Sequence, residues 1–144
     1  MLALSLALLL TQSAAPQAKP GWSATTLEAA SAEANKKVLA AAVPMTITGE
    51  VVDVSCYTQL GKRGAAHKEC GAKCVLAGAP VGIVTADDTL YILMPEPHHP
   101  RRDGKVSIAK EYAAKMGTTV TVSGMASTHG GIHTLFIPVA AAAQ

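Results

Sequence analysis

The stretch MTITGEVVDVS, residues 45–55, decides the fold, because it changes the pattern of the chain from helical to extended. It is rich in β-branched residues, and Gly49 in its middle predicts a bulge or a sharp bend in a strand. Four later segments have the same character and are also predicted to be strands: residues 81–86, 89–94, 118–125 and 132–139. Gly130-Gly131 is typical of a tight hairpin before the last of them. From residue 45 onward we expect a mainly β domain.

Three helices are predicted around these strands. One covers about residues 65–77 and carries two cysteines, and another covers residues 107–116 between the third and fourth strands. An N-terminal helix is expected over residues 25–41, starting at a capping box formed by Thr25 and Glu28. This order predicts an α+β fold built on a five-stranded OB-like Greek-key barrel, with the Cys/His-bearing helix inserted after strand 1. An open α+β sheet is the alternative.

The N-terminal segment predicts export. Residues 2–10 read LALSLALLL, an apolar run that has the length of a signal-peptide core and is too short to cross a bilayer. We expect a signal peptide over residues 1–18, with its cleavage site open, a tether and helix over residues 19–44, and the OB-like domain over residues 45–140. The protein is then periplasmic or secreted, with no transmembrane span in the mature chain; an uncleaved anchor is the alternative.

Composition argues against several function classes. The chain of 144 residues carries a formal net charge of +2, and only 3% of its residues are aromatic. A nucleic-acid partner is therefore not expected, because such proteins use a strongly basic surface and stacking aromatic side chains. The sequence also contains no G-x-S-x-G, no H-E-x-x-H and no glycine-rich phosphate loop, so no independent enzymatic activity is predicted.

The cysteines lie in one pattern, C-x10-H-x2-C-x3-C, formed by Cys56, His67, Cys70 and Cys74. On a helix the last three residues are spaced i, i+3 and i+7 and share one face. Cys56 follows the first strand, and the GKRG loop, residues 61–64, lets the helix fold back over it. Three thiolates and an imidazole suit tetrahedral Zn²⁺, so the pattern predicts a structural zinc site.

Two other uses of these residues stay open. An exported protein can form a disulfide, here Cys56–Cys70 or Cys56–Cys74, which would leave one thiol over. Copper is another metal that these residues could bind, because two thiolates, a histidine and Met94 or Met125 are the soft donors that Cu(I) prefers. The cluster would then cycle between a disulfide and a metal-loaded form, or exchange metal.

Residues around the cluster predict supporting roles. Four cations surround it in the sequence and are expected to favour the thiolates: Lys62, Arg63, Lys68 and Lys73. Asp53 is expected to hydrogen-bond the ligand loop, and Tyr57 to cover the site on its apolar side. His98 and His99 are auxiliary metal-binding candidates in a proline-rich loop, where an exposed polar role is the simpler interpretation.

The segments GEVVDVSC (49–56), HKECGAKC (67–74), AGAPVGIV (77–84) and TVTVSG (119–124) resemble a group of small secreted bacterial proteins of largely unknown function. These share a G-x3-D-x2-C…H-x2-C-x3-C…G pattern on an OB-like barrel. The resemblance covers about residues 45–139. It implies the barrel fold and implies that the four Cys and His residues act as a set.

Together these patterns predict an extracytoplasmic, metal-binding OB-like domain that prefers Zn²⁺. It would act as a binding or structural accessory subunit of a larger periplasmic or membrane-associated assembly, with a protein as its partner. A thiol-redox, electron-transfer or copper-handling protein is the first alternative. A disulfide-stapled interaction domain is the second.

Overall fold

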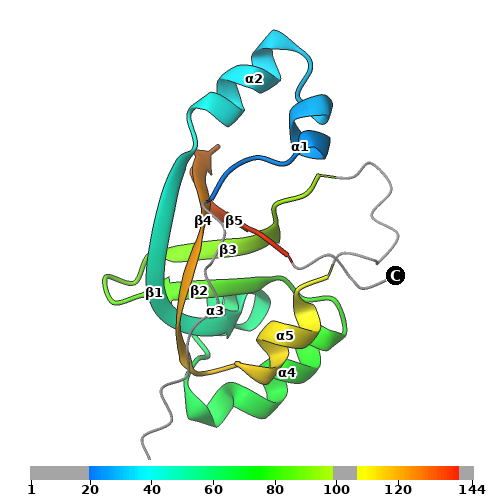
Figure 1. Ribbon diagram of the computed structural model, residues 1–144. Coiled ribbons are helices and arrows are strands. Elements are labelled where there is room, and N and C mark those ends of the chain that lie inside the picture. Colours follow the sequence, from blue (N-terminus) through cyan, green and yellow to red (C-terminus); the bar gives the residue numbers. More distant parts are fainter. Residues whose placement is uncertain (1–19, 99–106, 140–144) are drawn as a thin grey trace, which may run out of the picture.

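The strands of the computed structural model form one closed barrel (Figure 1). The structure describes residues 20–98 and 107–139, so the predicted signal peptide lies outside the described residues. The elements are, in chain order, α1 (Ala24–Ala29), α2 (Glu33–Ala40), β1 (Val43–Asp53), α3 (Val54–Leu60), the 3-10 helix η1 (Ala65–His67), α4 (Lys68–Leu76), β2 (Val81–Thr85), β3 (Leu90–Pro95), α5 (Ala109–Ala114), β4 (Thr119–His129) and β5 (Ile132–Ile137).

The strand order around the barrel is β1-β2-β3-β5-β4, and β4 pairs with β1 to close it. All neighbours are antiparallel except β3 and β5, which run parallel. The barrel is therefore mixed, and the open-sheet alternative is wrong. All five predicted strands are present, with α5 between the third and fourth as expected.

Strand β1 closes the barrel because it pairs with two neighbours. Its C-terminal part pairs with β2 and its N-terminal part with β4, and the two regions overlap at Gly49 and Glu50. A Cβ atom at Gly49 would overlap the carbonyl oxygen of Val84 and lie 2.6 Å from Cγ2 of Ile83. A side chain would thus prevent this close approach of β1 to β2. The bend predicted at Gly49 is seen as the curvature of β1 in Figure 1.

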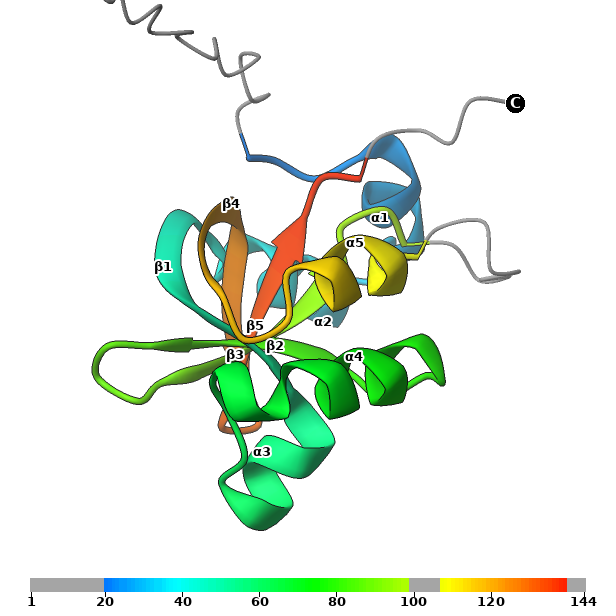
Figure 2. The same ribbon diagram turned by 90° about the horizontal axis from the view of Figure 1, so that it is seen from below.

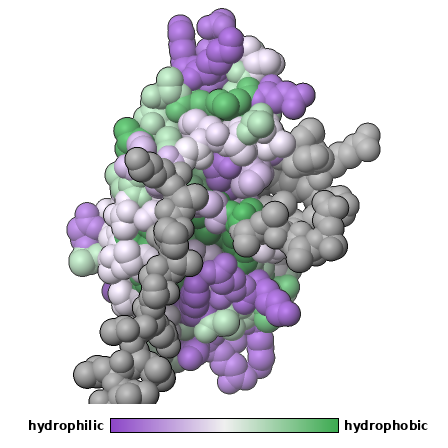
Figure 3. All heavy atoms as spheres, in the orientation of Figure 1, coloured by the Kyte–Doolittle hydropathy of each residue, from purple (hydrophilic) through white to green (hydrophobic). Residues whose placement is uncertain are grey.

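The core is aliphatic and draws on every strand. Val51, Ile83 and Leu135 are fully buried inside the barrel. Val75 of α4 and Tyr112 of α5 join the same cluster, so these two helices cover one end of the barrel. Figure 2 shows α4 and α5 side by side there, with α3 next to them. In Figure 3 the outer surface at this end is mostly hydrophilic.

The N-terminal helical region differs from its prediction. The structure has two short helices, α1 and α2, where one continuous helix was expected. The capping box is also wrong, because Ser23 caps α1 by accepting a hydrogen bond from the backbone N–H of Thr26. Both residues also contact Glu96 at the end of β3: its carboxylate accepts the Ser23 N–H at 2.7 Å, and its carbonyl accepts the Thr26 hydroxyl at 2.9 Å. These bonds attach α1 to the barrel end remote from α4 (Figure 1).

No helix within residues 20–98 and 107–139 is long and apolar enough to cross a bilayer.

We expect Gly49→Ala to lower the free energy of unfolding by about 1–3 kcal/mol, because the added methyl group meets backbone and a buried side chain. Gly21→Ala is the matched control, since a Cβ there meets nothing within 4 Å. Urea denaturation of both variants measures the difference. Equal stability of the two variants would contradict the role given to Gly49.

Candidate metal centre

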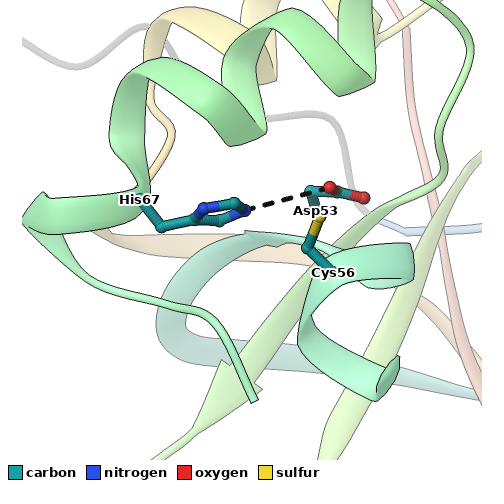
Figure 4. A group of neighbouring side chains, drawn as sticks. All are labelled: Asp53, Cys56 and His67. Carbon is teal, nitrogen blue, oxygen red and sulfur yellow. Dashed lines mark ion pairs between the residues drawn. The ribbon is translucent and has the colours of Figure 1, made fainter. Parts of the chain in front are cut away.

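Three side chains from different elements converge at the end of the barrel covered by α4. They are Asp53 at the end of β1, Cys56 in α3 and His67 at the end of η1 (Figure 4). One ligand atom of each, a carboxylate oxygen, a sulfur and an imidazole nitrogen, lies within 4.8 Å of the other two. Asp53 and His67 are buried and Cys56 is half-buried.

Asp53 is positioned by the junction between β1 and α3. It is the last residue of β1, pairs with Val81 of β2, and is 0% exposed. Its Oδ1 atom accepts a hydrogen bond of 2.9 Å from the backbone N–H of Ser55, which caps α3. The backbone N–H of Val54, which lies between Asp53 and Ser55, donates to the Pro80 carbonyl at 2.9 Å. With Oδ1 used by the cap, Oδ2 is the oxygen left for the site.

His67 is positioned by the loop before it. Its backbone N–H donates to the Gly64 carbonyl at 3.0 Å. The N–H of Gly64 in turn donates to the carboxylate of Glu50, on β1. Gly64 has φ = 75°, a left-handed conformation that favours glycine. Glu50 also pairs with Arg63, whose Nε lies 3.4 Å from Oε2, so two neighbouring residues of the GKRG loop are attached to β1.

The imidazole of His67 packs against a glycine in α4. A Cβ atom at Gly71 would lie 3.2 Å from Cδ2 of His67 and 3.0 Å from the sulfur of Met116. Gly71 is buried, and its missing side chain leaves the space that the ring occupies. This packing aims the ring toward Asp53 (Figure 4).

Two polar atoms of the cluster lack hydrogen bonds. Oδ2 of Asp53 and Nε2 of His67 are both buried and have no partner among the described residues. They lie 4.0 Å from each other. Burying a polar atom without a partner costs about 1–3 kcal/mol, and such atoms are rare in folded proteins. A group placed between these two atoms would satisfy both.

Cys56 is held as a neutral thiol in this arrangement. Its pKa is raised from 9.0 to about 11, chiefly by the neighbouring carboxylate of Asp53 and also by burial. The expected effect of neighbouring cations on this thiol is therefore wrong. The carboxylate is nearer, and Lys73 pairs instead with Glu69 at 2.8 Å. Arg63 likewise pairs with Asp88 at 2.9 Å and with Glu50, so its charge is directed to the barrel.

The other two cysteines lie outside the compact group. Cys74 is half-buried, and its pKa is raised chiefly by burial and then by the charges of Asp53 and Cys70. Cys70 is exposed. All three cysteines are free, so neither predicted disulfide is present. Of the predicted set, the structure brings Cys56 and His67 together within 4.8 Å, and adds Asp53.

Of the auxiliary candidates, Tyr57 follows Cys56 in α3 and is half-buried, whereas His98 lies away from the group. His98 is exposed at the other end of the barrel, and its backbone N–H donates to the Thr26 hydroxyl beside α1. His99 lies outside the described residues. Met94 and Met125 both pair in register with Phe136, which contacts Trp22 at the same remote end.

Asp53 was predicted to have only a supporting role, because helix α3 was not predicted. With Cys56 expected in a loop, nothing fixed its side chain relative to the end of the strand. The helix places Cys56 three residues after its own capping residue, so the thiol and the carboxylate meet. The D-x2-C spacing could have predicted this arrangement, because an aspartate that caps a helix is followed by the first helical turn, which here contains the cysteine.

We expect Asp53→Asn to increase the alkylation rate of Cys56 at pH 8 at least about tenfold, because removing the carboxylate lowers the thiol pKa and each unit changes the thiolate fraction tenfold. Asparagine retains the capping oxygen. Tryptic peptides 38–62, 69–73 and 74–101 separate the three cysteines, so mass spectrometry reads each rate in metal-free protein.

Cys70 is the internal control, because its exposed thiol should react at the same rate in both proteins. An unchanged Cys56 rate in the variant would contradict the effect of the Asp53 carboxylate on the pKa of this thiol. In the unsubstituted protein the raised pKa means that the neutral thiol stabilises the fold below about pH 9, and that this contribution is lost as the pH rises through about 11.

The comparisons with known proteins give no relative from which to transfer a function. The chain matches no protein-family model, no curated protein and no solved structure. The functional argument therefore depends on the chemistry of the cluster and on the topology of the barrel.

Proposed function

We propose that this protein is an extracytoplasmic metal-binding domain that holds one Zn²⁺ ion through Asp53, Cys56 and His67. The observation that supports this most is the pair of buried, unpartnered atoms, Oδ2 of Asp53 and Nε2 of His67, 4.0 Å apart. A buried carboxylate oxygen and imidazole nitrogen facing each other beside a thiol are three of the donors that zinc binds.

The dimensions of the cluster fit this ion. Zinc binds oxygen, nitrogen and sulfur at about 2.0–2.3 Å, so ligand atoms in a tetrahedral site lie roughly 3.3–3.8 Å apart. The observed separations of up to 4.8 Å need only a small contraction. Cys74 interacts with Cys56 and is the nearest candidate for the fourth ligand. An ion would also reverse the effect of Asp53 on Cys56, because a coordinated thiol loses its proton.

We further infer that the barrel is of the OB type. The order β1-β2-β3-β5-β4, closure through β1 and β4, and a helix between the third and fourth strands are the features that support it. Such barrels serve many functions, so the fold supports a binding role without naming a ligand.

The proposed location and partner are supported by the sequence. The apolar run over residues 2–10 favours export to the periplasm or secretion. The chain carries no known catalytic motif, which favours an accessory or structural subunit whose partner is another protein of a larger assembly. The zinc ion would hold α3 and the GKRG loop against the barrel and thereby shape this end of the molecule for the partner.

A thiol-redox role is the second candidate function, favoured by the interaction between Cys56 and Cys74. Oxidation of this pair would join α3 to α4 and remove Cys56 from the metal. Metal content and intact mass distinguish the two states, because a disulfide lowers the mass by about two hydrogens and leaves no site for zinc.

We expect the purified protein to bind one equivalent of Zn²⁺ or Co²⁺, and the Co²⁺ form to show thiolate-to-metal absorption. Cys56→Ser should weaken that absorption, because one thiolate ligand is lost, and Asp53→Asn and His67→Gln should each weaken binding at least about tenfold, since each removes a ligand. Titration against a competing chelator and native mass spectrometry provide the measurements.

His129→Gln is the matched control, because His129 is exposed on the β4–β5 hairpin and should leave the affinity unchanged. Binding that survives His67→Gln, or that falls equally in His129→Gln, would contradict the assignment. Metal-free protein with the lower mass would support the disulfide-linked state instead.

A separate expectation concerns Gly71. Gly71→Ala should weaken Zn²⁺ binding by about 10–100-fold, the usual effect of disturbing the residues that orient a ligand. The added methyl group would lie 3.2 Å from the imidazole of His67 and turn the ring from the site. The helix itself should persist, because alanine favours helix more than glycine does.

Competition titration gives the affinity of Gly71→Ala, and circular dichroism checks the fold. Gly21→Ala repeats the same chemical change at a position without neighbours and should bind zinc normally. Full affinity in Gly71→Ala would show that the glycine does not set the orientation of the ring.

A further inference from the structure

Helix α4 begins directly after the metal-site residue His67 and carries two cysteines that differ in exposure. Cys70 and Cys74 are spaced i and i+4 and therefore lie one turn apart on one helix face. His67 is buried in the cluster, Cys74 is half-buried, and Cys70 is exposed. Cys74 lies one helical turn from Cys70 on α4, and Cys56 lies within 4.8 Å of His67 at the start of the same helix. Three sulfurs therefore connect the surface of α4 to the buried carboxylate and imidazole.

A site that only holds a metal ion does not need all three of these thiols. Asp53, Cys56 and His67 form the compact group, and Cys74 can complete four ligands without Cys70. Cys70 nevertheless lies in the open, next to Cys74 along the helix. An exposed thiol adjoining a half-buried thiol is the geometry required for a metal ion to change ligands stepwise.

We infer that Cys70, Cys74 and Cys56 form a transfer route along which a metal ion, presented on a thiolate ligand of another molecule, passes from the surface to the buried site. This inference rests on the proposed metal-binding function and names the chemistry of its partner. That partner is a metal carrier with sulfur ligands, such as a protein or small molecule that holds zinc through cysteine.

Each step of the route is a ligand substitution without a change in oxidation state. Cys70 loses its proton to solvent and forms a metal–sulfur bond while a bond to the carrier breaks, and the released carrier thiolate takes up a proton. Cys74 and then Cys56 replace the earlier ligands in the same way. The ion ends between Asp53, Cys56 and His67, with Cys70 protonated again. Soft thiolate ligands bind zinc strongly, so handing the ion from sulfur to sulfur avoids a free aqueous ion.

The outer surface of α4 is suited to a transient encounter. Cys70 follows Glu69, which pairs with Lys73 at 2.8 Å, and both charged residues are strongly exposed. The outer surface at this end of the molecule is mostly hydrophilic in Figure 3. A polar surface around a reactive thiol favours contacts that form and dissociate quickly, as a carrier requires.

The test compares the rate of loading with the equilibrium affinity. Metal-free protein is mixed with Zn²⁺ bound to cysteine, a thiolate donor, or with Zn²⁺ bound to citrate, an oxygen donor, and loading is followed by stopped-flow with a zinc-sensitive dye. Cys70→Ser should slow loading from zinc–cysteine at least about tenfold, while its equilibrium affinity stays within about twofold of the unsubstituted protein. Loading from zinc–citrate should change much less.

Ala114→Ser is the matched control, because it places serine at an exposed position of helix α5 and retains every thiol. It should load at the normal rate from both donors. Unchanged loading of Cys70→Ser from zinc–cysteine would overturn the route. A fall of more than tenfold in the equilibrium affinity of Cys70→Ser would also overturn it, since Cys70 would then be a resident ligand. Failure of the unsubstituted protein to bind zinc at all would reject the proposed function itself.

Discussion

The junction at Asp53 links the architecture of this protein to its chemistry. One carboxylate ends β1, caps α3 through Oδ1, and directs Oδ2 at the imidazole of His67. Its backbone is held in the barrel by pairing with Val81. Because the capping bond and the strand pairing restrict the side chain, the second oxygen has little freedom to reach solvent. The barrel thereby enforces the burial of a polar atom without a protein partner.

That enforced burial distinguishes a site from a chance cluster. Acidic and cysteine side chains often meet at surfaces, where water satisfies them at no cost. Here Oδ2 of Asp53 and Nε2 of His67 are buried away from water. The two atoms lie 4.0 Å apart, too far to form a hydrogen bond with each other. The ring packs against the backbone of α4 at Gly71, where the sulfur of Met116 also lies close, so its position depends on this helix. The protein maintains this arrangement at the expense of stability, as functional sites commonly do.

Much of the fold could be predicted from local patterns in the sequence. The β-branched runs located all five strands, and Gly130-Gly131 marked the last hairpin, where both glycines have positive φ. Helix α5 was expected because Ile108 and Tyr112 recur at helical spacing. In the structure both residues are buried. Closure of the barrel could not be derived in this way, because it depends on β1 pairing with β4, more than 70 residues away in the sequence.

The candidate site was predicted in outline, and its composition was not. Spacing alone indicated that Cys56 and His67 would meet, but it gave Cys70 and Cys74 equal standing with them. Helix periodicity places side chains on a common face without stating how deep each lies, so Cys70 at the surface could not be told from His67 in the interior. Asp53 was undervalued because the short helix α3 has no apolar stripe to reveal it, and none of its residues is buried.

The guanidinium of Arg63 has a mechanical consequence for this site. It joins Glu50 of β1 to Asp88 in the turn between β2 and β3, a turn that holds Asp88 at φ = 60°. The segment that ends in His67 is therefore connected by ion pairs to the β2–β3 hairpin, whose first strand pairs with β1. A displacement of that hairpin, for instance by a neighbouring molecule pressing on it, would pull directly on the backbone that supports the imidazole. Movement of the β2–β3 turn is thus coupled to the position of His67, although the turn contributes no atom to the cluster.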